Sequence, residues 1–556
     1  MIREEPHVDM KYTNAAPLMF LVLVTVALFV PFVHKPFNID DPLFIWTAKH
    51  IQHNPLDFYG FDVNWGKKIT SMASVNKNPP LFSYFLAGVG IVCGWSEAAM
   101  HLAVMVSLIA LALGTFRLAG QLGGNPLQAA LISMCTPVVM VSGTSVMCDV
   151  PMVALWVWAV SYWIDGNEAP YHMWPMLGAG LMIAAAGLTK YFGASLIPLL
   201  ASYSLMRRTP FRQWFPYLLV PMALFILYNV GTCHTYGIGL MTDAFVFSAD
   251  VHQNSSPYTV QRIIDSLSFT GGGLITALFF APLLFRLQGR LICASTMAGL
   301  CIILHFWGIE RSSNFGISIQ QAVFITAASV LLTVAAADFI GNRDAKSLLL
   351  MLWVMGTFMF ACVVNWTVSE RIILPMAPAA GILISRRLAL RTQQRNNLEW
   401  AGFALALIPA LSLSLLVTLA DYRWSSEIHK VVQRIRLHSP PPGQSLWFQG
   451  HWGFQYYMEQ IGGKTLDFAA SEAHTGDLLV RPSFTTNFEN LPDDVFDIVD
   501  TLQTAPLSWL AVMAPSTGAG FYSNEIGPLP YAFDRVTPET YWIHEFKQNM
   551  RFMERK

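Results

Sequence analysis

The chain has 556 residues, of which 54% are hydrophobic and only 12% carry a charge. Soluble domains carry about 25% charged residues, and a soluble fold of this length could not bury so much apolar surface. The composition therefore indicates a polytopic membrane protein. The formal net charge of −1 gives no basic field for a nucleic acid partner. The cysteines form no CxxC pair, which argues against a disulfide framework or a zinc site.

Apolar runs long enough to cross a bilayer recur along most of the chain. A spanning helix needs about 20 apolar residues. The first run has no small-residue cleavage site behind it, so we interpret it as a retained anchor rather than a signal peptide. This criterion predicts about thirteen spans, at 16–34, 97–116, 126–146, 149–165, 174–190, 191–206, 214–232, 266–285, 291–309, 320–337, 347–364, 372–385 and 399–420.

Basic residues in the connecting loops set the expected orientation, because cytoplasmic loops are rich in Lys and Arg. The basic loops fall on one side only if the short segment 79–95 does not span, so we interpret that segment as re-entrant or interfacial. The N-terminus is then cytoplasmic. The loop 35–96, the loop 233–265 and the tail are extracytoplasmic. The basic loops are 207–212, 286–290, 343–346 and 386–395.

The tail, residues 421–556, differs in composition from the rest of the chain and contains no predicted span. Its alternating apolar segments predict short strands, and one segment between them predicts a helix. We therefore expect an all-α polytopic membrane domain over 1–420, followed by a small α/β extracytoplasmic domain over 421–556. The predicted strands are 444–450, 463–469, 477–484 and 507–515, and the helix is 451–462.

Two adjacent acids, Asp40 and Asp41, follow the first span at the start of an amphipathic segment, "DPLFIWTAKHI". Asp41 precedes Pro42, and an Asp before a Pro is a favoured start of a helix. We interpret Asp41 as the N-cap of an interfacial helix. Asp40 is not needed as a cap, so it is the better candidate for a general base or a ligand. Whether Asp41 also supports a site stays open.

Four further charged residues lie close to predicted membrane boundaries. Asp149 opens one span, Lys190 lies at the end of another, and Arg371 immediately precedes a third. Charges are rare and costly in such positions, and they favour a functional interpretation. Lys77 precedes the segment 79–95, and it would serve as an interfacial anchor or hold a lipid phosphate. Asp149 alone would serve as a helix-start residue favoured by the helix dipole.

These motifs resemble a known family when they are taken in chain order. Paired acids after a first span, then "NKNPPLFSYFLA", "CDVPMVALW", "LTKYFG" and "SERIILPMAPAAG", resemble the GT-C glycosyltransferases. The resemblance is to glycosyltransferase family 39, the protein O-mannosyltransferases, and to the bacterial lipid A aminoarabinose transferases. It implies a polyprenyl-phosphate-sugar donor, an extracytoplasmic acceptor (lipid, glycan or protein), and a bacterial inner membrane.

The resemblance also implies roles for individual residues. The first acid of the family's pair is catalytic, which makes Asp40 the base, and the second is usually Glu, where this chain has Asp41. Asp149 matches the second family acid. Lys190 matches the lysine of "LTK-G", although Tyr191 replaces the glycine. Three cations, Lys190, Arg371 and Lys77, would then hold the donor phosphate. Arg371 matches the Arg of "R-x-x-L-P". Lys77 stands one position before the family's lysine, because Asn78 directly precedes the prolines here.

A single displacement at the anomeric carbon would invert it, with Asp40 taking the proton from the acceptor. Asp40 and Asp149 would share a divalent metal ion if one is used, although two acids are too few to define a site. Two other functions stay open. One is a transporter or flippase of a lipid-linked saccharide, disfavoured because the charges gather at one face and no internal repeat is present. The other is a non-catalytic assembly or sensor protein.

Overall fold

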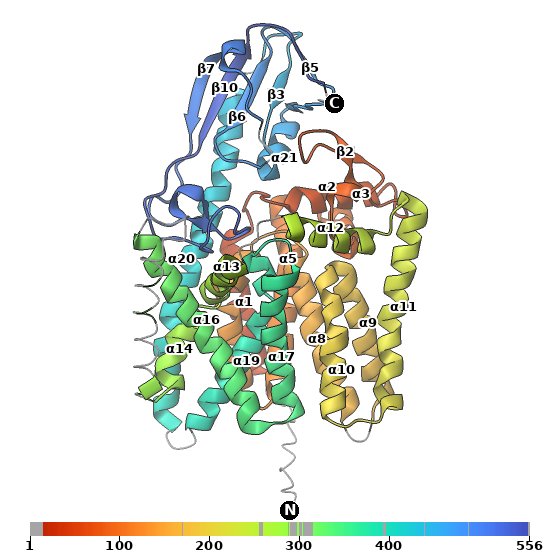
Figure 1. Ribbon diagram of the computed structural model, residues 1–556, viewed down its shortest axis with the longest axis vertical. Helices are drawn as coiled ribbons and strands as arrows, with labels where there is room; N and C mark the ends of the chain where they lie inside the picture. Colours follow the sequence, from red (N-terminus) through yellow and green to blue (C-terminus); the bar gives the residue numbers. More distant parts are fainter. Residues whose placement is uncertain are drawn as a thin grey trace, which may run out of the picture.

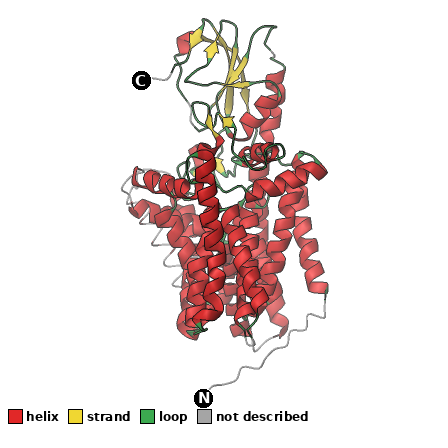
Figure 2. Cartoon of the chain, turned by 90° about the vertical axis from the view of Figure 1, so that its right-hand side faces the viewer, coloured by secondary structure: helices red, strands yellow, loops and turns green. Residues whose placement is uncertain are grey.

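The computed structural model describes residues 15–168, 171–254, 259–286, 315–392, 396–438, 440–486 and 489–553, with isolated positions between 287 and 314. A helical bundle makes up most of the molecule, and a mixed sheet lies beyond one end of it (Figures 1 and 2). We call this end of the bundle the sheet end.

The bundle is made of the helices that the apolar runs predict. They are α1 (Ala16–Phe29), α5 (Glu97–Gln121), α6 (Pro126–Met134), α7 (Pro137–Ser142), α8 (Asp149–Asn167), α9 (Met173–Thr189), α10 (Leu196–Met206), α11 (Phe211–Tyr236), α13 (Thr259–Gly273), α14 (Thr276–Leu284), α16 (Phe315–Asn342), α17 (Ala345–Met359), α19 (Met376–Thr392) and α20 (Asn396–Arg436).

Within the described residues, five helices are long and apolar enough to cross a membrane, or six if the bent pair α13–α14 is one span. The chain is therefore a multi-pass membrane protein. Thirteen spans are not confirmed, because several predicted spans are short or broken helices. The predicted span 126–146 is divided between α6 and α7, and α13 and α14 meet at 78°. Most of the span 291–309, together with Arg290 and Arg395, lies outside the described residues.

The connections of the bundle agree with the predicted sidedness. The turn between α10 and α11 and the turn between α16 and α17 lie at the end opposite the sheet (Figure 1). Both turns belong to the basic loops of the sequence. Helices α12 (Leu240–Asn254) and α2 (Asp41–Ile51) instead lie across the sheet end (Figure 1).

The loop that follows α1 forms a layer over the sheet end. It contains α2, the short hairpin β1 (Asp62–Val63) and β2 (Thr70–Ser71), α3 (Met72–Val75) and α4 (Leu81–Cys93). Pro42 lies in the first turn of α2, where its missing N–H costs nothing. Helix α4 is the segment predicted not to span, and it packs mainly against α2. At 13 residues it is shorter than the hydrocarbon core requires.

The tail folds into a five-stranded sheet of order β4-β3-β6-β10-β7. Strands β3 (Leu446–Phe448) and β4 (Lys464–Thr465) are parallel and are joined by α21 (Trp452–Gln460), as the pattern predicts. Strands β6 (Leu478–Pro482), β10 (Thr540–Phe546) and β7 (Phe496–Gln503) are antiparallel neighbours. The strand predicted over 507–515 is wrong for most of its length, since only β8 (Met513–Ala514) forms there, paired with β9 (Ala519–Gly520).

The tail and the bundle are continuous. Helix α20 passes the expected boundary at residue 421 without a break and ends at Arg436. Part of the tail also returns to the bundle: the Glu370 N–H donates to the Phe521 carbonyl at 3.0 Å, and Asn524 Nδ2 donates to Asp265 at 2.8 Å. Helix α21 approaches the loop before α2 so closely that a Cβ on Gly453 would lie 1.9 Å from the Phe37 carbonyl oxygen.

Candidate functional site

Asp40 and Arg371 form an ion pair at the sheet end of the bundle. Asp40 directly precedes α2, and Arg371 lies in the short helix α18 (Glu370–Ile373). Arg371 Nη1 donates to Asp40 Oδ2 at 2.8 Å, and the two side chains are 20% and 27% exposed. The pair is therefore within reach of a ligand. Its residues are 331 positions apart, and only the packing of helices brings them together.

The backbone immediately before Asp40 is strained. Ile39 has a φ of 47°, in the left-handed region that β-branched residues rarely adopt. Such a conformation costs about 1–3 kcal/mol and persists only where the surrounding structure imposes it. Strain of this kind concentrates at functional sites. Asp40 and Asp41, which follow Ile39, contact different partners.

Asp41 is fully buried and does not cap α2. Its Oδ2 accepts from the Asn38 N–H at 2.9 Å, and its Oδ1 accepts from the Val146 N–H at 2.9 Å. The helix begins at Asp41 itself, so the prediction that Asp41 is the N-cap is wrong. The carboxyl group instead joins the turn before α2 to the loop before α8. Asp41 is thus a positioning residue between the segments that carry Asp40 and Asp149.

Burial, only partly offset by nearby Lys35, raises the pKa of Asp41 to about 7. A carboxyl group whose pKa is higher in the folded chain stabilises the fold when it is protonated. That contribution is present at acidic pH and is lost as the pH rises through about 7. The melting temperature of the wild type relative to Asp41→Asn should therefore be higher at about pH 5 than at about pH 8. A difference that stays constant or grows with pH would contradict this assignment.

Asp149 and Lys190 form a second ion pair. Asp149 is the first residue of α8, and Lys190 is an extended residue between α9 and a 3₁₀ turn. The Lys190 Nζ donates to Asp149 Oδ1, and only 3% of the Asp149 side chain is exposed. Although burial alone would lower it, the carboxylates of Asp40 and Asp149 raise the pKa of Arg371 above its ordinary value. The two ion pairs thus form one electrostatic cluster.

Lys77 lies to one side of this cluster. Its Nζ is 2.6 Å from Asp243 Oδ2 on α12 and 5.2 Å from the centre of the Phe247 ring. Its neighbour Asn78 contacts the segment before Asp149, where Cys148 Sγ is 3.6 Å from Asn78 Oδ1. Lys77 stands one position before the lysine of the family pattern, and this difference has a structural consequence. Asn78 faces the Asp149 segment, and Lys77 turns toward α12.

A buried network beside the cluster is absent from the sequence prediction. Lys35 and Asp421 are both 0% exposed and form an ion pair. Tyr522 of the tail donates to Asp421 Oδ1 at 3.1 Å, and its ring lies 6.0 Å from the Arg371 guanidinium. Lys35 and Asp421 each lie next to the end of a predicted span, and charges at such positions could have indicated a functional or structural ion pair. No sequence pattern around Tyr522 indicates that it joins this network.

The network should contribute strongly to folding. The change Lys35→Met leaves Asp421 charged, buried and without its cation, which typically costs about 3–5 kcal/mol. We expect a large fall in the melting temperature of the detergent-purified protein. The double change Lys35→Met/Asp421→Leu should recover most of the loss, because it removes both charges of the pair. A double variant no more stable than Lys35→Met would show that the ion pair is not the cause.

The carboxylates of Asp40 and Asp149 offer a poor site for a metal ion. Among the described residues, no group of three or more His, Cys, Asp or Glu side chains gathers as metal ligands would. Asp40 and Asp149 each contact a cationic side chain instead. The donor set does not fit a hard divalent cation, which takes six or more oxygen ligands.

Comparison with known proteins supports the resemblance seen in the sequence. Residues 77–231 match the family model of dolichyl-phosphate-mannose-protein mannosyltransferases. The resemblance to protein O-mannosyltransferases is thus confirmed for this part of the chain. The matched segment contains Lys77, Asp149 and Lys190. Asp40, Asp41 and Arg371 lie outside this segment. No curated protein matches the chain in a sequence search.

The chain is also similar to several solved structures at low sequence identity. ArnT from Cupriavidus metallidurans bound to undecaprenyl phosphate is 14% identical, with 85% of this chain and 94% of that chain covered and a TM-score of 0.39. AglB from Archaeoglobus fulgidus, in complex with an inhibitory peptide and a dolichol-phosphate, is 12% identical, covers 85% and 69%, and has a TM-score of 0.47. The arabinofuranosyltransferase AftD from Mycobacteria is 14% identical, covers 95% and 41%, and has a TM-score of 0.42.

Proposed function

We propose that the chain is an integral membrane glycosyltransferase that moves a sugar from a polyprenyl-phosphate-sugar donor to an acceptor outside the cytoplasm. The observation that carries this proposal is the cluster of two ion pairs, Asp40–Arg371 and Asp149–Lys190, at the sheet end of the bundle. A reaction that expels a lipid phosphate needs cations where negative charge develops and a base near the acceptor. The cluster supplies both kinds of group.

Asp40 is the proposed general base. It would accept the proton of the acceptor's nucleophile as the nucleophile attacks the anomeric carbon, and a single displacement would invert that carbon. In the free protein its Oδ2 accepts from Arg371, so this oxygen is already occupied. A donor phosphate that draws Arg371 away would therefore free this oxygen to accept the proton of the nucleophile. The base would then become effective only after the donor binds.

Lys190 and Arg371 are the proposed phosphate ligands. Arg presents a planar fork of donors that matches phosphate oxygens, and Lys adds a point charge. Asp149 would hold Lys190 in place, which gives this acid a positioning role in the proposed site. Lys77 is 24% exposed beside α12, and it would contribute to the phosphate only after leaving Asp243. We therefore assign Lys77 the weaker effect.

The orientation and location of the protein belong to the same proposal. The basic turns opposite the sheet would be cytoplasmic, and the tail would lie in the periplasm or outside the cell. The resemblance to bacterial transferases favours a bacterial inner membrane, with about thirteen spans in all. The acceptor would be a lipid, a glycan or a protein.

A transport assay separates this function from that of a flippase. The purified chain is placed in liposomes with a polyprenyl-phosphate-sugar extracted from the source membranes, and with the extracytoplasmic fraction as acceptor. A transferase should release free polyprenyl phosphate in step with sugar incorporation. Movement of the intact donor between leaflets, with no free polyprenyl phosphate formed, would support a flippase and contradict the proposal.

A further inference from the structure

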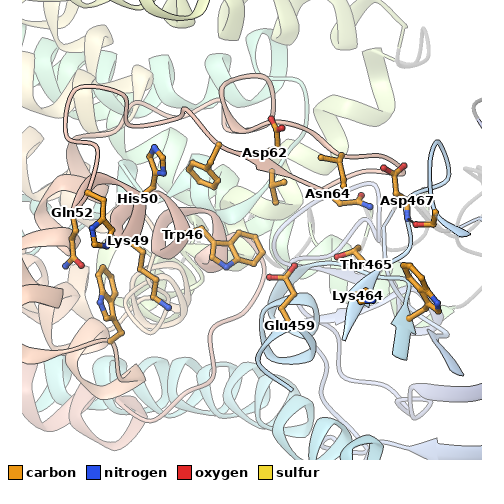
Figure 3. A pocket seen from close by; sticks show the side chains of 17 residues that line it. Trp46, Lys49, His50, Gln52, Asp62, Asn64, Glu459, Lys464, Thr465 and Asp467 are labelled. Carbon is orange, nitrogen blue, oxygen red and sulfur yellow. Dashed lines mark hydrogen bonds between the residues drawn. The ribbon is translucent and has the colours of Figure 1, made fainter. Parts of the chain in front are cut away.

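A large cavity lies between the layer over the sheet end and the tail, away from the charged cluster. Its volume is about 880 Å³, within the range of about 300–1,000 Å³ typical of ligand pockets. The helix α2 and the hairpin loop form one wall, and α21, β4 and the segment after β4 form the other (Figure 3). The Asn64 amide donates to the Leu466 carbonyl at 3.2 Å, and the Phe468 N–H donates to the Lys67 carbonyl at 2.9 Å. These contacts hold the two walls together.

Indole rings are prominent in the lining. Trp46, Trp95 and Trp447 all line the cavity. Trp46 projects from the middle of α2 (Figure 3). Its ring packs edge-on against that of Trp65, with 6.0 Å between the ring centroids. Lys49 and Lys464 lie over the rings of Trp95 and Trp447, at 5.5 and 5.6 Å. Neighbours thus fix the orientation of the rings. Such rings offer flat apolar faces, with a polar N–H at one edge.

Polar groups surround these rings and include an unusual buried acceptor. Asn64 is 6% exposed, and its Oδ1 accepts no hydrogen bond within the described part of the chain. A buried polar atom without a partner is costly, and it indicates a place where a ligand donor would bind. The rest of the lining is mixed in charge, with Lys49 and Lys464 against Asp62, Glu459 and Asp467. No single sign of charge dominates, which disfavours a polyanion or a polycation.

Helix α2 links this cavity to the charged cluster. Asp40 directly precedes the helix, and Trp46 and His50 in the cavity lie six and ten residues later. At a rise of 1.5 Å per residue, these side chains begin roughly 9 and 15 Å from Asp40 along the axis. The helix therefore fixes the separation between the proposed base and the cavity. A ligand extending from one to the other would be several rings long.

We infer that this cavity binds the saccharide portion of the acceptor, a few sugar residues away from the hydroxyl that is glycosylated. The inference rests on the proposed function and deepens it, because it makes the acceptor a glycan or glycolipid. Sugar rings present C–H groups that pack on indole faces, and hydroxyls that both donate and accept hydrogen bonds. An array of indoles, carboxylates, ammonium groups and one unpaired amide oxygen suits that chemistry. A peptide is the competing ligand.

The test is direct binding by the full chain in detergent, without a donor. The labelled protein is applied to an array that carries oligosaccharides and peptides, and the best-retained saccharide is then titrated. We expect retention on a saccharide. Trp46→Leu, Trp447→Leu and Asp62→Ala should each weaken the affinity for it, the tryptophan variants by about two- to tenfold, because each loses a stacked aromatic contact.

Trp509→Leu is the matched control. Trp509 is 46% exposed in the tail and is not among the residues that line the cavity, so its loss should leave binding unchanged. Asp62 is exposed on the rim, and its substitution tests the cavity with little risk to the fold. Retention on no saccharide, retention on peptides alone, or unchanged affinity in both tryptophan variants would overturn the inference. Asp40→Asn should bind normally, so a failure of transfer is distinguishable from a failure of this site.

Discussion

Asp40→Asn should abolish transfer while leaving the fold intact. A general base contributes about 10²–10⁴-fold to the rate, and an Asn cannot accept the proton. Because the side chain is 27% exposed and solvent screens its ion pair with Arg371, the cost to stability should be small. The initial rate of polyprenyl phosphate release by purified protein in nanodiscs measures the effect. The melting temperature of the same sample measures the fold.

The matched control for this change is Asp497→Asn. Asp497 is 71% exposed on β7, where it pairs with Lys547, and exposed pairs contribute about 0–1 kcal/mol. It should transfer at the wild-type rate. Asp41→Asn is a useful comparison with Asp40→Asn, because Asp41 acts on the site only through the backbone N–H groups of Asn38 and Val146. Wild-type activity in Asp40→Asn would remove Asp40 from the mechanism.

Lys190→Met should lower both activity and stability. Removal of one hydrogen-bond donor aimed at developing negative charge typically costs about 10²–10³ in kcat. The change also leaves Asp149, only 3% exposed, without its cation, and breaking a buried pair typically costs about 3–5 kcal/mol. Lys77→Met should lower the rate less, because Lys77 pairs with Asp243 rather than with the cluster. Rates at saturating donor and melting temperatures check both expectations.

A double variant separates the two effects of Lys190. Lys190→Met/Asp149→Asn carries no buried charge at this position, so its melting temperature should return toward that of the wild type. Its rate should stay low, because the phosphate ligand is still missing. The exposed change Lys547→Met on the tail is the control for a general loss of positive charge. A double variant with wild-type kcat would show that Lys190 serves only to neutralise Asp149.

Much of the fold is visible in the sequence because apolar runs and helix signals are local. Most bundle helices overlap the predicted ranges, and β3, α21, β4 and β6 follow the predicted pattern, whereas α12 lies in a segment predicted as a loop. Strand β10 is rich in the aromatic and β-branched residues that favour strands, "TYWIHEF", and could have been predicted. Strand β7 is an edge strand with mostly exposed side chains, so burial imposes little pattern on it.

The charged cluster was predictable through sidedness, whereas its individual contacts were not. Counting spans puts Asp40, Asp149, Lys190 and Arg371 at one end, and the structure brings them into two ion pairs. Pro42 suggests that Asp41 is a helix cap. The Val146 N–H that donates to Asp41 is 105 residues away, so no local pattern could indicate it. Tyr522 reaches Arg371 only because a loop of the tail returns to the bundle. No local pattern encodes such a return.

The most direct measurement of the central claim is mass spectrometry of lipids and glycans from cells that lack the gene. A lipid-phosphate-dependent glycosyltransferase predicts that a polyprenyl-phosphate-sugar accumulates and that one glycan or glycolipid loses that sugar. The wild-type gene should reverse both changes, and the gene with Asp40→Asn should reverse neither. An unchanged lipid and glycan profile, or full restoration by Asp40→Asn, would contradict the account.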